Sequence, residues 1–173
     1  TTKMLPVESD VPEWLVTKGR ERGATSRERA VGDLTTIAFY YLLRVGEYTV
    51  KGKRNETKQT VQFKLEDITF FRKNAAGQLR CLPRDAPDRM IMTADGATLK
   101  LDNQKNGWKG VCIHQQIDGE LVHCPVRALG RRVFHIQTHT NDPRTRLSTF
   151  FITTPTGSPR VYDVTDNDMR TSL

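Results

Sequence analysis

The sequence has 173 residues, a net charge of +7, 36% hydrophobic residues and 27% charged residues. This length and composition predict a globular domain with its own core and exclude a disordered polar chain. No run approaches the roughly 18 apolar residues of a membrane span, and the first residues lack the apolar core of a signal peptide. We expect a chain that is neither secreted nor membrane-bound. Its excess of Lys and Arg favours a polyanionic partner, of which nucleic acid is the commonest.

Residues 1–24 have the composition of an entry segment or linker, with prolines and glycines spread among charged residues. A short helix is expected near residues 13–22, where Trp14 and Leu15 would dock the segment onto the following domain. That domain is predicted over residues 25–173. Because residue 1 is not Met and a last helix is cut off after residue 173, we expect an internal piece of a longer protein.

A long helix is predicted over residues 26–45. Thr25 and Glu28 have the T-x-x-E spacing of a capping box at its start. Apolar residues then recur at intervals of three and four, which is typical of a helix with one buried face. The central residues of this face are Leu34, Ile37 and Tyr41.

Arg44 continues the same face one turn further, and Gly46 is expected to end the helix before Glu47. The guanidinium should therefore point inward or into a cleft. A buried guanidinium needs a carboxylate partner or an anion, and phosphate is the commonest anion for a basic protein. The alternative is a structural salt bridge from Arg44 to Glu47. Glu47 itself could equally be a solvated loop residue.

Beyond residue 50 the pattern changes to the alternation of strands. Short strands are predicted over residues 60–63 and 68–71, followed by a hairpin over residues 97–116. A two-residue turn in this hairpin would mix its two faces. A three-residue loop at 106–108 keeps the faces separate and pairs Leu101 with Ile113, so we prefer that register.

A second helix is expected to begin at Pro125, because proline suits the first position of a helix. A short strand over residues 148–153 and an extended segment around Tyr162 follow. Thr165 and Asp168 have the spacing to cap a final helix. The apolar face of the second helix consists of Val126, Leu129, Val133 and Ile136. Together these elements predict an α+β fold, mostly helical, with a small antiparallel sheet.

Three sequence features are informative as an ordered set: Leu-Leu-Arg-Val-Gly-Glu at 42–47, Lys105 in the hairpin, and His-Cys-Pro-Val-Arg-Ala-Leu at 123–129. This set resembles the catalytic domain of tyrosine recombinases of the phage-integrase type, above all those of eukaryotic mobile elements. The resemblance covers residues 25–173. It implies a truncated recombinase catalytic fold and a parent protein that breaks and rejoins DNA through a phosphotyrosine intermediate.

The resemblance gives three residues catalytic roles. Arg44 matches the first catalytic arginine, which would hold non-bridging oxygens of the scissile phosphate. Glu47 matches the acidic residue that would orient this arginine. Lys105 matches the hairpin lysine that would act as general acid toward the departing oxygen. The alternative is that Lys105 and the nearby Lys109 are simply solvated charges of the hairpin that bind phosphate.

Basic side chains beyond these three are predicted to contact the DNA backbone. One run directly follows the arginine motif, and smaller patches lie further along the chain. Charge runs are usually solvated faces, but here the excess is basic and the run is near the predicted phosphate site in sequence. The predicted DNA contacts are Lys51, Lys53, Arg54, Lys58, Arg72, Lys73, Lys109, Arg131 and Arg132.

No metal or cofactor is expected. The four histidines match no strong zinc spacing, and the three cysteines show no metal-like pairing, which fits a reducing compartment. Tyr40 and Tyr41 are explained by packing in the helix rather than as nucleophiles. The predicted partner is double-stranded DNA, with self-association on DNA at full length.

The family pattern continues with a His-x-x-Arg box, a further His or Trp, and the tyrosine nucleophile, and no residues here match them. We therefore expect this chain to bind DNA without cutting it. Two other interpretations stay open: a non-catalytic DNA-binding module derived from such a recombinase, and an unrelated basic α+β domain that binds RNA or a protein. A nuclear location would follow from a eukaryotic source, and a cytoplasmic one otherwise.

Overall fold

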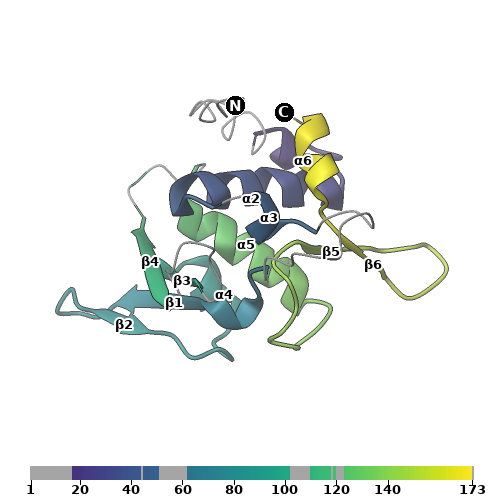
Figure 1. Cartoon of the computed structure of the whole chain (residues 1–173). Coiled ribbons are helices and arrows are strands. Elements are labelled where there is room, and N and C mark those ends of the chain that lie inside the picture. Colours follow the sequence, from purple (N-terminus) through teal and green to yellow (C-terminus); the bar gives the residue numbers. More distant parts are fainter. Residues whose placement is uncertain are drawn as a thin grey trace, which may run out of the picture.

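The computed structural model describes residues 17–43, 45–50, 62–101, 110–117, 119 and 123–172. Two central helices, α2 and α5, lie beside a four-stranded antiparallel sheet, and a separate two-stranded sheet lies at the other end of the helices (Figure 1). The prediction of an α+β fold with a small antiparallel sheet is confirmed. Of the short helix expected near residues 13–22, the described part is helical at residues 17–20.

Helix α2 (Ser26–Tyr41) begins where the sequence predicts and ends earlier. The Thr25 hydroxyl accepts a hydrogen bond from the Glu28 backbone N–H at 3.1 Å, which confirms the N-terminal cap. Leu42 then adopts a left-handed conformation (φ 56°) and its N–H donates to the Ala38 carbonyl, which ends the helix. The predicted end at residue 45 is wrong. Glycine usually supplies such a cap, so a leucine in that position gives no sequence signal.

Helix α3 (Val45–Tyr48) is a separate short helix that follows α2. Gly46 lies inside α3 and does not end α2, which corrects the prediction for that residue. The predicted core face of α2, formed by Leu34, Ile37 and Tyr41, is fully buried.

The four-stranded sheet has the strand order β2-β1-β3-β4. Its strands are β1 (Ile68–Lys73), β2 (Leu79–Cys81), β3 (Gly96–Leu101) and β4 (Val111–Gln116). The strand predicted over residues 68–71 is confirmed as β1. Residues 60 and 61 of the strand predicted over residues 60–63 lie outside the described residues, and Phe63 belongs to no strand. Its N–H donates to the Glu47 carbonyl and its carbonyl accepts from the Leu147 N–H, so it bridges two distant segments.

Strands β3 and β4 form the predicted hairpin, but their register differs from the expected one. Leu99 lies opposite Ile113, and Leu101 lies opposite Val111. This is a shift of two residues from the predicted pairing of Leu101 with Ile113. Because side chains alternate with a period of two, such a shift keeps each residue on its predicted face. The apolar pattern could therefore not distinguish the two registers.

Helix α5 (Pro125–Gln137) begins at Pro125 as predicted, and its predicted apolar face is buried. It packs against α2 and against the short helix α4 (Asp88–Met92). Gly130 permits a close approach to α4, because a Cβ at this position would lie 3.3 Å from the Ile91 carbonyl oxygen. A one-turn 3-10 helix, η1 (Leu65–Asp67), leads into β1.

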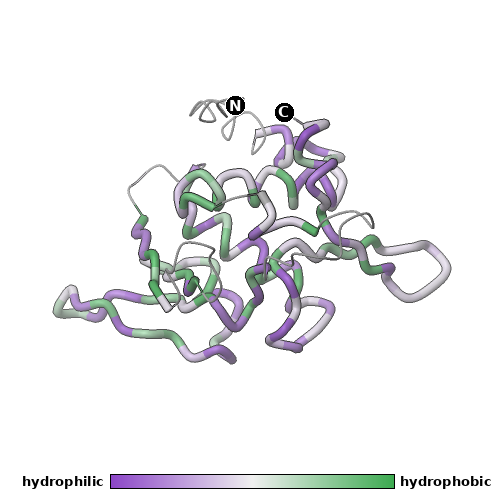
Figure 2. The backbone as a smooth tube through the Cα atoms, in the orientation of Figure 1, coloured by the Kyte–Doolittle hydropathy of each residue, from purple (hydrophilic) through white to green (hydrophobic). Residues whose placement is uncertain are grey.

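The two-stranded sheet pairs β5 (Thr149–Ile152) with β6 (Arg160–Asp163) and leads to helix α6 (Asp166–Ser172). The predicted cap of α6 is confirmed in both directions. The Asp168 N–H donates to the Thr165 hydroxyl at 3.1 Å, and the Thr165 N–H donates to the Asp168 carboxylate at 3.0 Å. Figure 2 shows α6 as mostly hydrophilic, and it buries Met169 against the core.

Candidate nucleic-acid interface

The residues predicted to carry the chemistry divide between described and undescribed segments. Arg44 and Lys105 lie outside the described residues, as do the contacts predicted at Lys51, Lys53, Arg54, Lys58 and Lys109. The structure describes the elements that precede or follow these residues in the chain. Those elements are the end of α2, helix α3, and the two strands of the β3–β4 hairpin.

Glu47 lies in α3 and is only 4% exposed. The alternative that Glu47 is a solvated loop glutamate is therefore wrong. Its neighbours Tyr48 and Thr49 are also buried, and its carbonyl accepts a hydrogen bond from the Phe63 N–H at 3.0 Å. A carboxylate inside a protein needs a cation or hydrogen-bond donors close by. Glu47 is therefore a carboxylate of the folded interior and not a surface charge.

The C-terminal end of α2 is bound to the hairpin by two side-chain hydrogen bonds. The Tyr41 hydroxyl donates to the Ala97 carbonyl of β3 at 2.8 Å, and the Gln115 amide of β4 donates to the Tyr40 carbonyl at 3.0 Å. Burial raises the pKa of Tyr41, and the charge of Cys124 raises it by a smaller amount. A buried phenol that donates to a carbonyl is a structural group, which agrees with the packing role predicted for Tyr41.

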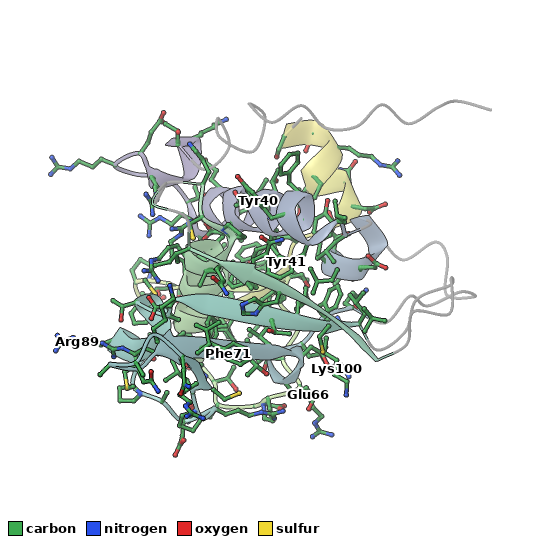
Figure 3. The ribbon with its side chains drawn as sticks, turned by 90° about the vertical axis from the view of Figure 1, so that its left-hand side faces the viewer. Tyr40, Tyr41, Glu66, Phe71, Arg89 and Lys100 are labelled. Atoms are coloured by element: carbon green, nitrogen blue, oxygen red, sulfur yellow. The ribbon has the colours of Figure 1, made fainter. Side chains whose placement is uncertain are left out.

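The hairpin strands are described as far as Leu101 of β3 and Val111 of β4. Figure 3 labels Tyr40 and Tyr41 above the sheet, and Lys100, close to the end of β3, towards the side on which α3 lies. Lys100 immediately precedes Leu101, the last residue of β3, and Gly110 donates its N–H to the Leu101 carbonyl at 2.7 Å. The described ends of the hairpin are thus paired up to this point.

Arg72 and Lys73 are exposed on β1, as a phosphate contact requires. Arg72 pairs across the sheet with Arg80 of β2, another exposed cation that the sequence analysis did not single out. These residues lie far from Leu101, the last residue of β3. Arg72 is four positions along β1 from Ile68, which lies opposite Leu99, so about 14 Å of strand separates the two levels.

Arg131 and Arg132 do not form the exposed patch that the sequence suggested. Arg132 is 2% exposed, and its guanidinium donates to the Leu147 carbonyl at 3.3 Å and to the Thr149 carbonyl. Burial lowers its pKa to about 10, and the charge of Asp33 opposes this shift. The guanidinium is bound within the protein interior, so the predicted contact of Arg132 with DNA is wrong.

Arg131 is bound to a carboxylate of α2. Its Nε and Nη2 atoms lie 2.9 Å and 2.8 Å from Asp33 Oδ1, and its side chain is 19% exposed. Helical spacing could have indicated the burial of the neighbouring Arg132, because it lies three residues after Leu129 and four before Ile136 on the core face. No comparable sequence signal links Asp33 to Arg131, which are 98 residues apart.

The histidines of the described part have hydrogen-bonding and packing roles. The Phe151 N–H donates to His135 Nε2 at 2.9 Å, and His114 Nδ1 lies 2.8 Å from the Thr98 hydroxyl. The His139 ring stacks on Phe151 at a centroid distance of 4.4 Å. Within the described ranges, no three His, Cys, Asp or Glu residues come together in a way that could hold a metal ion.

Comparisons of the chain with protein-family models, with curated proteins and with solved structures found no match. Across the described ranges, each helix is too short or too polar to span a bilayer.

Proposed function

We propose that this chain is the DNA-binding part of a recombinase that breaks and rejoins DNA through a phosphotyrosine intermediate. The observation that carries the proposal is the pair of hydrogen bonds from the end of α2 to the hairpin, Tyr41 to Ala97 and Gln115 to Tyr40. Arg44 follows α2 in the chain, and Lys105 lies between β3 and β4. The two hydrogen bonds reach the hairpin at Ala97 and Gln115, four residues along β3 from its last residue, Leu101. They fix α2 against the hairpin strands, and this fixed arrangement supports a single site that uses both residues.

The burial of Glu47 supports the same site. In the proposed reaction, a tyrosine oxygen attacks the phosphorus of a DNA phosphodiester, and the bond to a deoxyribose oxygen breaks. The Arg44 guanidinium holds non-bridging oxygens on which charge develops, and Glu47 orients that guanidinium. Lys105 gives a proton to the departing oxygen, which leaves as a hydroxyl. The net charge of +7 favours duplex DNA as the substrate.

Duplex-DNA binding over a salt series tests this proposal. We expect the wild-type chain to bind at low salt, with affinity that falls steeply as salt rises. Arg44→Ala should weaken binding by about tenfold or more and reduce the slope by about one charge. Arg160→Ala removes an exposed arginine of β6 and is the matched control, with an expected change below about twofold. A wild-type chain that does not bind duplex DNA at low salt would overturn the proposal.

The non-catalytic alternative predicts the same binding, so a covalent assay separates the two. A nicked duplex that traps a phosphotyrosine adduct should give no adduct with this chain, because no residue in it matches the family's nucleophile. A longer protein that contains this chain should give the adduct if it is a recombinase. It should give none if it is a DNA-binding module.

A further inference from the structure

A second charged region lies between α2 and α5, away from the end of α2 discussed above. A pocket of about 470 Å³ opens between the helical turn at residues 17–20, the first half of α2 and the second half of α5. We call it the arginine pocket. The residues that define it here are Arg20, Arg29, Asp33, Arg131, Arg132 and His135.

The charges that line this pocket are unbalanced. Four guanidinium groups and a single carboxylate, that of Asp33, line it, so at least three positive charges have no counter-charge in the lining. Burial lowers the pKa of His135 to about 4, with further lowering by Arg132, His139 and Arg29, so the imidazole is neutral at physiological pH. The pocket is therefore positive without any contribution from His135.

Two of the arginines are not used to hold the described fold together. Arg20 and Arg29 are exposed, and neither guanidinium group has a hydrogen bond or an ion pair with another described residue. Burial and the charge of Arg131 lower the pKa of Arg20, while Asp33 opposes this shift. The guanidinium groups of Arg20 and Arg131 thus repel each other across the pocket, and a bound anion would relieve that repulsion.

The backbone brings Arg20 to the pocket through a close contact at Gly19. A Cβ at this position would lie 3.1 Å from the Glu28 carbonyl oxygen and 3.2 Å from the Arg29 Cα. The absence of a side chain therefore lets the turn at residues 17–20 approach the first turn of α2. Arg131 and Arg132 are fixed on the opposite wall by Asp33 and by the carbonyls of Leu147 and Thr149.

We infer that the arginine pocket binds a phosphate group through Arg20 and Arg29, with Arg131 and Arg132 supplying fixed positive charge behind them. Guanidinium groups match the oxygens of phosphate in shape, and a concave, low-dielectric wall concentrates their field. The phosphate comes from a nucleic-acid strand or from a small phosphorylated molecule. The pocket is distinct from the end of α2 that precedes Arg44 in the chain, because Asp33 lies eight residues before Tyr41 on α2, a distance of about 12 Å.

A calorimetric titration with inorganic pyrophosphate at low salt tests whether the arginine pocket binds phosphate. The double variant Arg20→Gln/Arg29→Gln should weaken pyrophosphate binding by about tenfold or more. The control is Arg22→Gln/Arg160→Gln, which removes the same charge from two exposed arginines outside the pocket and should change binding by less than about twofold. Thermal unfolding checks that both variants fold. A wild-type chain that does not bind pyrophosphate, or an equal loss in both variants, would overturn the inference.

A second arm identifies the source of the phosphate and separates this inference from the proposed function. If the pocket holds a DNA phosphate, Arg20→Gln/Arg29→Gln should weaken duplex binding more than the control variant does. If it holds a small molecule, duplex binding should match the control while pyrophosphate binding is lost. Arg44→Ala should leave pyrophosphate binding unchanged in either case. Loss of pyrophosphate binding in Arg44→Ala would contradict a separate site.

Discussion

The two ends of α2 are held by different chemistry. In its first half, Asp33 Oδ1 accepts a hydrogen bond from Arg131 Nε of α5 and forms an ion pair with Arg131 Nη2, and further arginines surround this pair. At its end, Tyr41 and the Tyr40 carbonyl are bound to the hairpin by neutral hydrogen bonds. Removing one partner of a charged pair of low exposure destabilises the protein, because the other charge is left unpaired. Neutral hydrogen bonds fix one element against another without burying a charge. Arg131 and Arg132, which are bound within the fold, therefore have structural roles.

The largest expected effect comes from breaking the charged end. Asp33→Ala leaves Arg131 without its carboxylate beside the buried Arg132, so we expect a loss of about 3–5 kcal/mol in the free energy of unfolding. Urea unfolding measures this loss. Asp142→Ala, which breaks an exposed pair with Arg144, is the control and should cost less than about 1 kcal/mol. Equal effects of the two substitutions would contradict the structural role of Asp33.

The neutral end should show a smaller effect. Tyr41→Phe removes the hydroxyl that donates to the Ala97 carbonyl inside the core. We expect a loss of about 1–2 kcal/mol in the free energy of unfolding, measured in urea. Hydrogen exchange of β3 and β4 should increase, because the hairpin loses a bond to α2. Unchanged exchange in these strands would show that Tyr41 does not fix the hairpin.

The charged end also predicts a pH dependence. Burial, with smaller contributions from Arg132, His139 and Arg29, lowers the pKa of His135 to about 4, below the roughly 6.5 of the unfolded chain. Between these values the unfolded state binds the proton and the folded state does not, so stability falls as pH drops from about 6.5 to 4. Because His135 is partly exposed, we expect a difference on the order of 1 kcal/mol between wild type and His135→Gln across this window. Identical pH profiles of the two proteins would contradict this account.

The smallest effect on the free energy of unfolding is expected for Arg72, an exposed arginine of β1. Arg72 lies directly opposite Arg80 on neighbouring strands, and like charges in this arrangement repel. Arg72→Gln should therefore stabilise the protein by roughly 0.2–0.5 kcal/mol at low salt, and the gain should vanish at high salt. A destabilising effect would show that Arg72 makes a structural contribution.

Local patterns in the sequence predicted the elements but not how they end or pair. The caps at Thr25 and Thr165, the start of α5 at Pro125 and the core faces of both long helices follow from spacing alone. The end of α2 at Leu42 was missed, because its left-handed conformation uses a residue with no preference for it. The hairpin register was missed by two residues, because alternation repeats every two.

The candidate site shows the same limit. The position of Arg132 on the core face of α5 could have indicated its burial, but the prediction of a DNA contact followed the excess of basic residues instead. The ion pair of Arg131 with Asp33 and the bond of Tyr41 to Ala97 join residues that are far apart in the chain. Such contacts depend on how the elements pack, so spacing within one element could not reveal them.

We propose that the residues after α2 and those between β3 and β4 act on one DNA phosphate. A double-mutant cycle of Arg44→Ala and Lys105→Ala, read as duplex-DNA affinity at fixed low salt, tests it most directly. We predict that the double variant loses clearly less than the sum of the two single losses, because both residues contact the same group. Losses that simply add, or a wild-type chain without affinity for duplex DNA, would contradict the claim.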